Sequence, residues 1–327
     1  MGARSTQGRG TGPNKTDGHL LRYFRDVFTS GGGASNLRAQ FDASGGTKII
    51  TASHIIHRFD TTGSDDFIVN SLGENSSVSI EYLVVGGGGA GGNTRGGGGG
   101  GGGARTGSFT LSNIGTYPIF VGEGGTAGTT NTAAGLNGQK SSFTIDGTTI
   151  ISQGGGGGGG GNDTAGKNGG SGGGGAANGG GGSGGTGNRG DSRPPAPVTP
   201  VNDGVPSQGY NGGTGYDTAP EYMGAGGGGA GGAGGDGSPP SFGAGGAALD
   251  SSITGSPVTY AGGGSGGNIA GTPGGQDPSA GAGAPPSIDV AGAGAAGRGG
   301  GGGGGADSRT GGAGGSGCVI VRYSATA

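Results

Sequence analysis

The sequence has few of the residues from which most folds are built. Its 327 residues include one cysteine, no tryptophan and 28% hydrophobic residues, whereas 102 residues are glycine. A single cysteine, Cys318, excludes an intramolecular disulfide and any metal site built on paired cysteines. So few apolar side chains cannot supply an ordinary hydrophobic core for a chain of this length. Much of the chain must therefore either stay unfolded or be held together in another way.

Charge is also scarce, and this narrows the classes of partner. Charged residues make up 11% of the chain, the formal net charge is -3, and no long run of lysine or arginine occurs. We therefore expect no binding to nucleic acid or to an anionic membrane surface. No apolar run reaches the roughly 18 residues of a membrane span, so we expect no membrane insertion. The first residues lack the apolar stretch of a secretory signal, which predicts synthesis in a cytoplasm without a signal peptide.

The first 33 residues contain one amphipathic pattern. Its apolar residues recur at helical spacing, and Gly31 to Gly33 end it. A helix of about twelve residues is marginal alone, so its apolar stripe must pack on something. Two readings stay open, docking on the chain's own domain and docking on another subunit. The residues of this predicted assembly helix are Leu20, Leu21, Phe24, Val27 and Phe28.

From about Lys48 to Ile151 the sequence is typical of β-strands. Runs such as "SSVSIEYLVV", "TYPIFVG" and "SSFTIDGTTIIS" are rich in β-branched and aromatic residues and are bounded by turn residues. Asp146-Gly147 predicts a two-residue hairpin. The closing "GCVIVRYS" has the same character, and we expect this last strand to pair back into the sheet region.

The glycine tracts keep a register of three. In "GGSGGTGNRGDS", which starts at Gly181, the residues Ser183, Thr186 and Arg189 are three apart, and the same spacing recurs in other tracts. A left-handed polyproline-II type helix has three residues per turn. Without side chains in the way, such helices could bond laterally through N–H and C=O groups, as a polyglycine-II bundle. The alternative is flexible low-complexity chain.

These patterns predict a mostly β fold combined with a polyglycine-II helix bundle. The β part is a small antiparallel sheet or sandwich scaffold, and a short amphipathic helix precedes it. The expected divisions are an N-terminal arm with the helix at residues 1–33, a β-strand region at 34–85, a glycine-rich bundle with interspersed strands and loops at 86–317, and a closing strand at 318–327.

The order of these motifs resembles that of the glycine-rich domain of bacteriophage tail-fibre and virion structural proteins. The resemblance covers about Glu81 to Tyr323. It depends on "SIEYLVVGGGGAGG", on the later "GSFTL" and "GTYPIFVGEGGTAG", and on the terminal "GGAGGSGCVIVRYS". Some members of this group are adhesins that form a polyglycine-II sandwich whose distal loops touch the host. The resemblance implies a virion protein with a rigid glycine-rich scaffold and binding loops between its tracts.

The loop expected to bind is the interruption from Asn188 to Met223. Tyrosine offers stacking area and a hydroxyl group at low entropic cost, and proline orders a loop before binding. A host-surface glycan or an outer-membrane protein would suit such a loop; the alternative is a solvated connector. The other expected partners are virion proteins, bound through the N-terminal helix, and further copies of the chain. The candidate receptor-binding residues are Tyr210, Tyr216, Tyr222, Met223, Arg189 and Asp191.

Nothing in the sequence predicts an enzyme, a cofactor or a metal site. The glycine runs lack the Lys-Ser/Thr of a phosphate-binding loop and the strand-to-helix context of a dinucleotide site. His54 and His57 are spaced as HxxH, but residues three apart on a strand point to opposite faces. The tripeptide Arg189-Gly190-Asp191 is too short to stand against chance. We therefore predict a virion adhesin; the alternatives are a self-assembling fibre subunit or capsid decoration protein, and an ice-binding or matrix protein.

Overall fold

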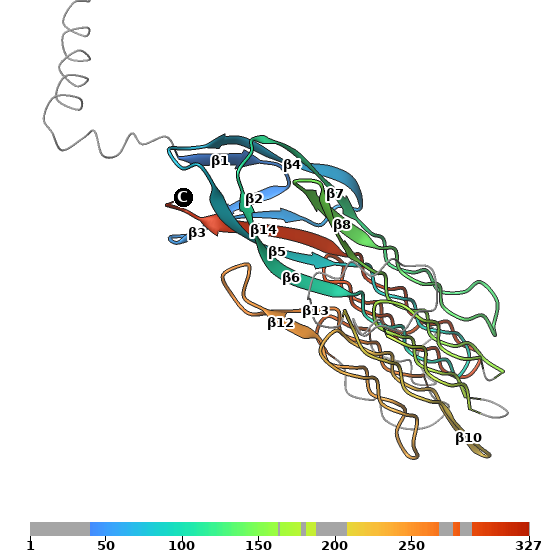
Figure 1. The fold of residues 1–327 in the computed structure, drawn as a ribbon. Coiled ribbons are helices and arrows are strands. Elements are labelled where there is room, and N and C mark those ends of the chain that lie inside the picture. The colour runs from blue at the N-terminus through green and yellow to red at the C-terminus, as the bar shows by residue number, and fades with distance from the viewer. Residues whose placement is uncertain are drawn as a thin grey trace, which may run out of the picture.

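The computed structural model describes residues 40–162, 164–177, 181–187, 208–267, 277–281 and 290–326. In this part of the chain, two five-stranded antiparallel sheets face each other, and extended glycine-rich segments run side by side from one end of them (Figure 1). The first sheet has the order β1 (Phe41–Ser44), β4 (Gly63–Leu72), β7 (Gly115–Val121), β8 (Ser141–Ile145), β9 (Thr148–Ser152). The second has the order β2 (Thr47–Ile50), β3 (His54–Phe59), β14 (Cys318–Ser324), β5 (Val78–Val85), β6 (Ala104–Leu111).

Alternation along the strands explains the core between the two sheets. In β5 the side chains of Val78, Ile80, Tyr82 and Val84 are buried, whereas Glu81 is exposed. They pack with aromatic and aliphatic side chains of the first sheet. Apolar side chains on one face of each sheet are therefore removed from water by the facing sheet.

The outer face of the second sheet is partly covered as well. Leu83 and Val85 of β5 and Ile320 of β14 pack in a second cluster with Ile253 and Tyr260. Tyr260 belongs to a small hairpin made of β12 (Leu249–Ser251) and β13 (Val258–Tyr260). This cover explains why the end of β5 is apolar on both faces.

Two local predictions of chain path are confirmed. The last strand, β14, lies in the middle of the second sheet, between β3 and β5. The predicted hairpin joins β8 to β9 through Asp146 and Gly147, both with positive φ. This backbone conformation matches a tight two-residue turn, and glycine adopts it without steric cost.

The glycine-rich residues form extended segments whose hydrogen bonds leave the segment. In 86–94 the N–H groups donate in rotation to three neighbours, so that each neighbour receives a bond from every third residue. Gly86, Gly89 and Gly92 donate to residues 97–103, whereas Gly88 and Gly91 donate to residues 312–315. The remaining direction is taken by Gly87, Ala90 and Asn93, which donate to residues 133–139. Three directions of bonding around one segment make a three-dimensional bundle.

Asparagine and aspartate side chains continue this bonding where the segments are exposed. Asn137 accepts from the Gly157 N–H group at 2.9 Å, and Asn168 accepts from Thr186 at 2.7 Å. Asn211 and Asp236 do the same for Gly187 and Thr214. Their side-chain oxygen atoms take the place that a backbone carbonyl group has inside the bundle.

The fold class expected from the sequence is wrong as stated. The described residues are all β, in several antiparallel sheets, and contain no helix. The glycine-rich residues are extended segments whose N–H groups donate to neighbouring segments. The expected N-terminal helix lies outside the described residues. Strands β6 (Ala104–Leu111), β7, β8 and β9 lie between glycine segments within the range 86–317.

A methyl group inside the bundle should destabilise it. A Cβ atom added to Gly99 would lie 2.1 Å from the carbonyl oxygen of Gly89 and 2.6 Å from its carbon, and both are backbone atoms. We expect Gly99→Ala to lower the free energy of unfolding by roughly 1–3 kcal/mol or more, as overpacking of a rigid interior does. Thermal and urea unfolding followed by circular dichroism would measure the loss.

Gly232→Ala is the matched control. The nearest atom to a Cβ atom added there is the side-chain Cβ of Ala247 at 3.3 Å, and Gly232 is only partly buried. We expect a change within about 0.5 kcal/mol, as at ordinary surface positions. Equal unfolding midpoints for Gly99→Ala and the unaltered protein would contradict close backbone packing in the bundle.

Candidate functional site

The ends of the glycine segments farthest from the C-terminus carry a small hairpin. It consists of β10 (Tyr216–Thr218) and β11 (Glu221–Met223), and it lies at the far tip of the bundle (Figure 1). Tyr216 pairs with Met223, and Asp217 pairs with Tyr222. Met223 is buried, both tyrosines are half-buried, and Glu221 is exposed. We call this hairpin, together with the neighbouring Arg95 and Asp307, the bundle tip.

Arg95 holds the bundle tip together. Its guanidinium carbon lies 4.4 Å from the centre of the Tyr222 ring, and its Nε lies 3.1 Å from a carboxylate oxygen of Asp307. Its backbone carbonyl accepts from the N–H of Ala177 at 3.1 Å. A cation over an aromatic face and beside a carboxylate fixes all three side chains relative to one another. The bundle tip thus joins turns that are far apart in the sequence.

Asn93 positions the turns next to Arg95 through its side-chain hydrogen bonds. Its side chain is 3% exposed, donates to the carbonyl groups of Gly128 and Thr130 at 2.9 and 2.6 Å, and accepts from the N–H of Gly311 at 2.8 Å. These bonds use both amide hydrogens and the amide oxygen. The neighbouring turns are therefore positioned by a buried and satisfied amide group.

The structure brings together some of the predicted receptor-binding residues. Tyr216, Tyr222 and Met223 share the hairpin. Tyr210 does not belong to it: it lies in an extended segment, and its backbone bonds to Gly229 and Gly172. The other two predicted residues, Arg189 and Asp191, lie outside the described part of the chain.

Arg95 and Asp307 were not predicted from the sequence. Neither lies near the tyrosines along the chain, so only the return of the glycine segments makes them neighbours. The one available signal was a charged residue in a turn between two glycine tracts, "GGNTRGGGG". Such a residue has to lie at an end of the bundle, where there is room for a side chain.

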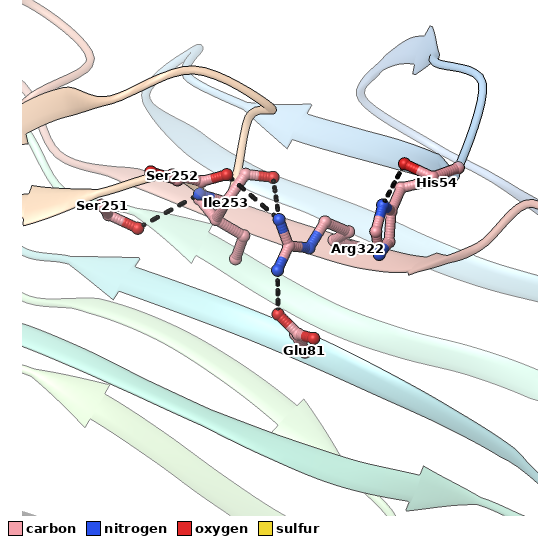
Figure 2. A network of polar contacts seen from close by, with 7 residues as sticks. His54, Glu81, Ser251, Ser252, Ile253 and Arg322 are labelled. Atoms are coloured by element: carbon pink, nitrogen blue, oxygen red, sulfur yellow. Dashed lines mark hydrogen bonds and ion pairs between the residues drawn. The ribbon is translucent and has the colours of Figure 1, made fainter.

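A polar pocket of about 460 Å³ lies over the outer face of the second sheet. Arg322 of β14 forms an ion pair with Glu81, which is directly across from it on β5. Arg322 Nη1 also donates to the carbonyl groups of Ser252 and Ile253, at 3.0 and 3.4 Å (Figure 2). These bonds fix the loop between β12 and β13 as one wall of the pocket. The lining residues are Glu81, Tyr82, Thr106, Gly107, Ser108, Ser251, Ser252, Ile253 and Arg322.

The two histidines of the HxxH pattern are in different surroundings. His54 is half-buried, with its Nδ1 2.8 Å from the hydroxyl of Ser53. His57 is buried: its Nδ1 lies 2.8 Å from the carbonyl oxygen of Gly45, and its Nε2 lies 3.2 Å from the hydroxyl of Tyr323. The described residues contain no group of three or more His, Cys, Asp or Glu side chains that could hold a metal ion. They also contain no helix long and apolar enough to cross a bilayer.

The bonds of His57 define its charge state. A carbonyl group only accepts, so Nδ1 carries the hydrogen and the neutral ring accepts at Nε2 from the Tyr323 hydroxyl group. Burial raises the pKa of Tyr323 to about 12, so the phenol keeps its proton. Burial is also the main cause that lowers the pKa of His57 below its ordinary value of 6.5. The folded protein therefore favours the neutral imidazole.

By sequence, the chain matches a known protein family. A family model described as a glycine-rich domain matches residues 69–324. No curated protein matches significantly. The matched range contains β5 to β14, the glycine segments between them, the bundle tip and the polar pocket.

The lowered pKa of His57 predicts a loss of stability in mild acid. As the pH falls below 6.5, the unfolded chain takes up a proton that the folded chain resists, so this contribution is present above pH 6.5 and is lost below it. The free energy of unfolding should fall by up to about 1.4 kcal/mol per pH unit from His57 alone. Urea unfolding at pH 7.5, 6.5 and 5.5 would measure this slope.

His57→Gln should flatten this slope, whereas His54→Gln should leave it as in the unaltered protein. His54 is the matched control because it belongs to the same strand but is not enclosed in the core. An unchanged slope in His57→Gln would show that other groups cause the acid sensitivity.

Proposed function

We propose that this chain, which belongs to the glycine-rich domain family, is a structural and adhesive protein of a bacteriophage virion that contacts the host surface with its bundle tip. The proposed location is the virion, and the proposed ligand is a host-surface glycan or an outer-membrane protein. Other virion proteins would bind through residues 20–28, which are outside the described part of the chain. The proposal also rests on the order of strands and glycine tracts, which resembles that of phage tail-fibre proteins.

The observation that carries the adhesive role is the arrangement of the bundle tip. Two tyrosines, an arginine and three carboxylates gather there on a scaffold whose segments are bonded to each other through their backbones. Aromatic side chains and arginine are the types that dominate binding energy at interfaces. Holding them on a rigid support lowers the entropy lost on binding.

Replacing the tyrosines of the bundle tip should weaken binding to cells. We expect Tyr216→Ser combined with Tyr222→Ser to reduce binding of the fluorescently labelled protein to susceptible bacteria by at least about tenfold, the effect of losing one or two interface anchors. Flow cytometry over a panel of bacterial strains would identify a binding strain and measure the loss.

Tyr210→Ser is the matched control, because Tyr210 is equally half-buried but lies outside the hairpin. Glu221→Lys adds a variant that leaves the rings in place, since Glu221 is exposed at the hairpin turn. The proposal would be contradicted if binding survived the Tyr216→Ser/Tyr222→Ser combination and Glu221→Lys but were lost with Tyr210→Ser.

A second candidate function is that of a self-assembling structural subunit without receptor binding. It is favoured by β2, an edge strand of the second sheet on which all four residues are exposed. Ile49 and Ile50 are 36% and 72% exposed. An exposed apolar edge strand is a template for pairing with another chain.

Ile50→Lys should dissociate such assemblies, because a lysine on an edge strand disfavours pairing. We expect a shift towards the monomer by at least about tenfold in the dissociation constant, measured by analytical ultracentrifugation. The matched control is Ile114→Lys, at an isoleucine that is 64% exposed in the loop between β6 and β7. A concentration-independent monomer in the unaltered protein would remove this candidate.

A further inference from the structure

We propose that the polar pocket beside Arg322 is a binding site for a neutral saccharide, separate from the bundle tip. Its volume of about 460 Å³ is within the usual range for small-ligand sites. The proposal does not depend on the adhesive role of the bundle tip, because the two sites lie on different parts of the molecule and share no residue.

The charges of the pocket favour a neutral ligand. The positive charge of Arg322 is already compensated by Glu81, and its Nη1 is used by the carbonyl groups of the wall. An anion would therefore have to displace Glu81. A cation would find one carboxylate, itself paired with an arginine. An ion of either sign would compete with a pair that is already made, whereas a neutral ligand leaves this pair in place.

The groups left open are those that bind hydroxyls. The Glu81 side chain is 52% exposed, and only its Oε2 is engaged with Arg322. The hydroxyls of Thr106 and Ser108 are exposed on neighbouring positions of the same face of β6, and neither bonds to another described residue. Ser251 Oγ accepts from the Ile253 N–H at 3.3 Å and keeps its own hydrogen to donate.

This set of groups matches a sugar with adjacent hydroxyls. A carboxylate oxygen accepts from one ligand hydroxyl in a charge-assisted bond, and serine and threonine hydroxyls donate to or accept from the next ones. A ligand with one polar group would leave most of these groups unmatched.

An array of neutral mono- and oligosaccharides tests the proposal, with uronic acids and amino sugars as charged counterparts. We expect binding to at least one neutral sugar, and isothermal titration calorimetry on the full chain would give its affinity. The combination Thr106→Val with Ser108→Ala removes two hydroxyls at almost constant shape and should weaken binding at least about tenfold.

Thr110→Val is the matched control. Thr110 is exposed on the same face of β6 but does not line the pocket, so its loss should leave the affinity unchanged. Three outcomes would overturn the proposal: no binding to any neutral sugar, tighter binding of a charged counterpart, or equal affinity in the Thr106/Ser108 variant. Variants at the bundle tip should not alter this affinity, which keeps this test separate from that of the proposed function.

Discussion

Backbone hydrogen bonds between neighbouring glycine segments are the interaction on which the rest of the structure depends. A hydrogen bond contributes roughly 0.5–1.5 kcal/mol net, while ordering one residue costs about 1–2 kcal/mol, and glycine is the most costly residue to order. A single segment therefore cannot remain ordered alone. The bundle removes this difficulty because each segment bonds in several directions, as 86–94 does with 97–103, 133–139 and 312–315. Ordering one segment thus positions donors and acceptors for its neighbours.

The sandwich supplies the fixed ends that such a bundle needs. β5 and β7 run directly into a glycine segment, and β9 does so after Gln153. β6 and β14 begin directly after such a segment, and β8 is separated from Gly138 by two residues. The hydrophobic core between the sheets holds these strands in register. The glycine segments therefore start at defined positions along the length of the bundle. Their N–H groups then meet the carbonyl groups of a given neighbour at every third residue. Apolar burial in one half of the molecule thus stabilises hydrogen bonding in the other half.

The sequence predicts the strands well, because their signals are local. Alternation at Val78, Ile80, Tyr82 and Val84 and the turn at Asp146-Gly147 require knowledge of only a few neighbouring residues. The class of the glycine-rich part was wrong, since a period of three in the sequence says how often a side chain recurs and does not by itself fix a helix. The pairing of segments is not predictable in this way, because one glycine tract has the same hydrogen-bonding groups as any other.

The same reasoning explains which parts of the two candidate sites could be found. Tyr216, Tyr222 and Met223 are close in the sequence and form one hairpin, so composition was enough to single them out. Arg95 and Asp307 meet only because two glycine segments end at the same end of the bundle. The ion pair between Glu81 and Arg322 depends on β14 returning to the middle of the second sheet, across most of the chain.

In this architecture, the residues that stabilise the bundle differ from those proposed to bind a partner. At glycines such as Gly99, an added Cβ atom would lie 2.1 Å from a carbonyl oxygen, far inside van der Waals contact, so these positions admit no side chain. The turns and hairpins at the ends of the segments have no such restriction, and Tyr222, Arg95 and Glu221 all lie there. Changes at those ends alter the surface presented to a partner without entering the backbone contacts of the bundle. A scaffold stabilised by its main chain is therefore suited to present variable surfaces, because the residues exposed at the ends are not those that make the backbone contacts of the bundle.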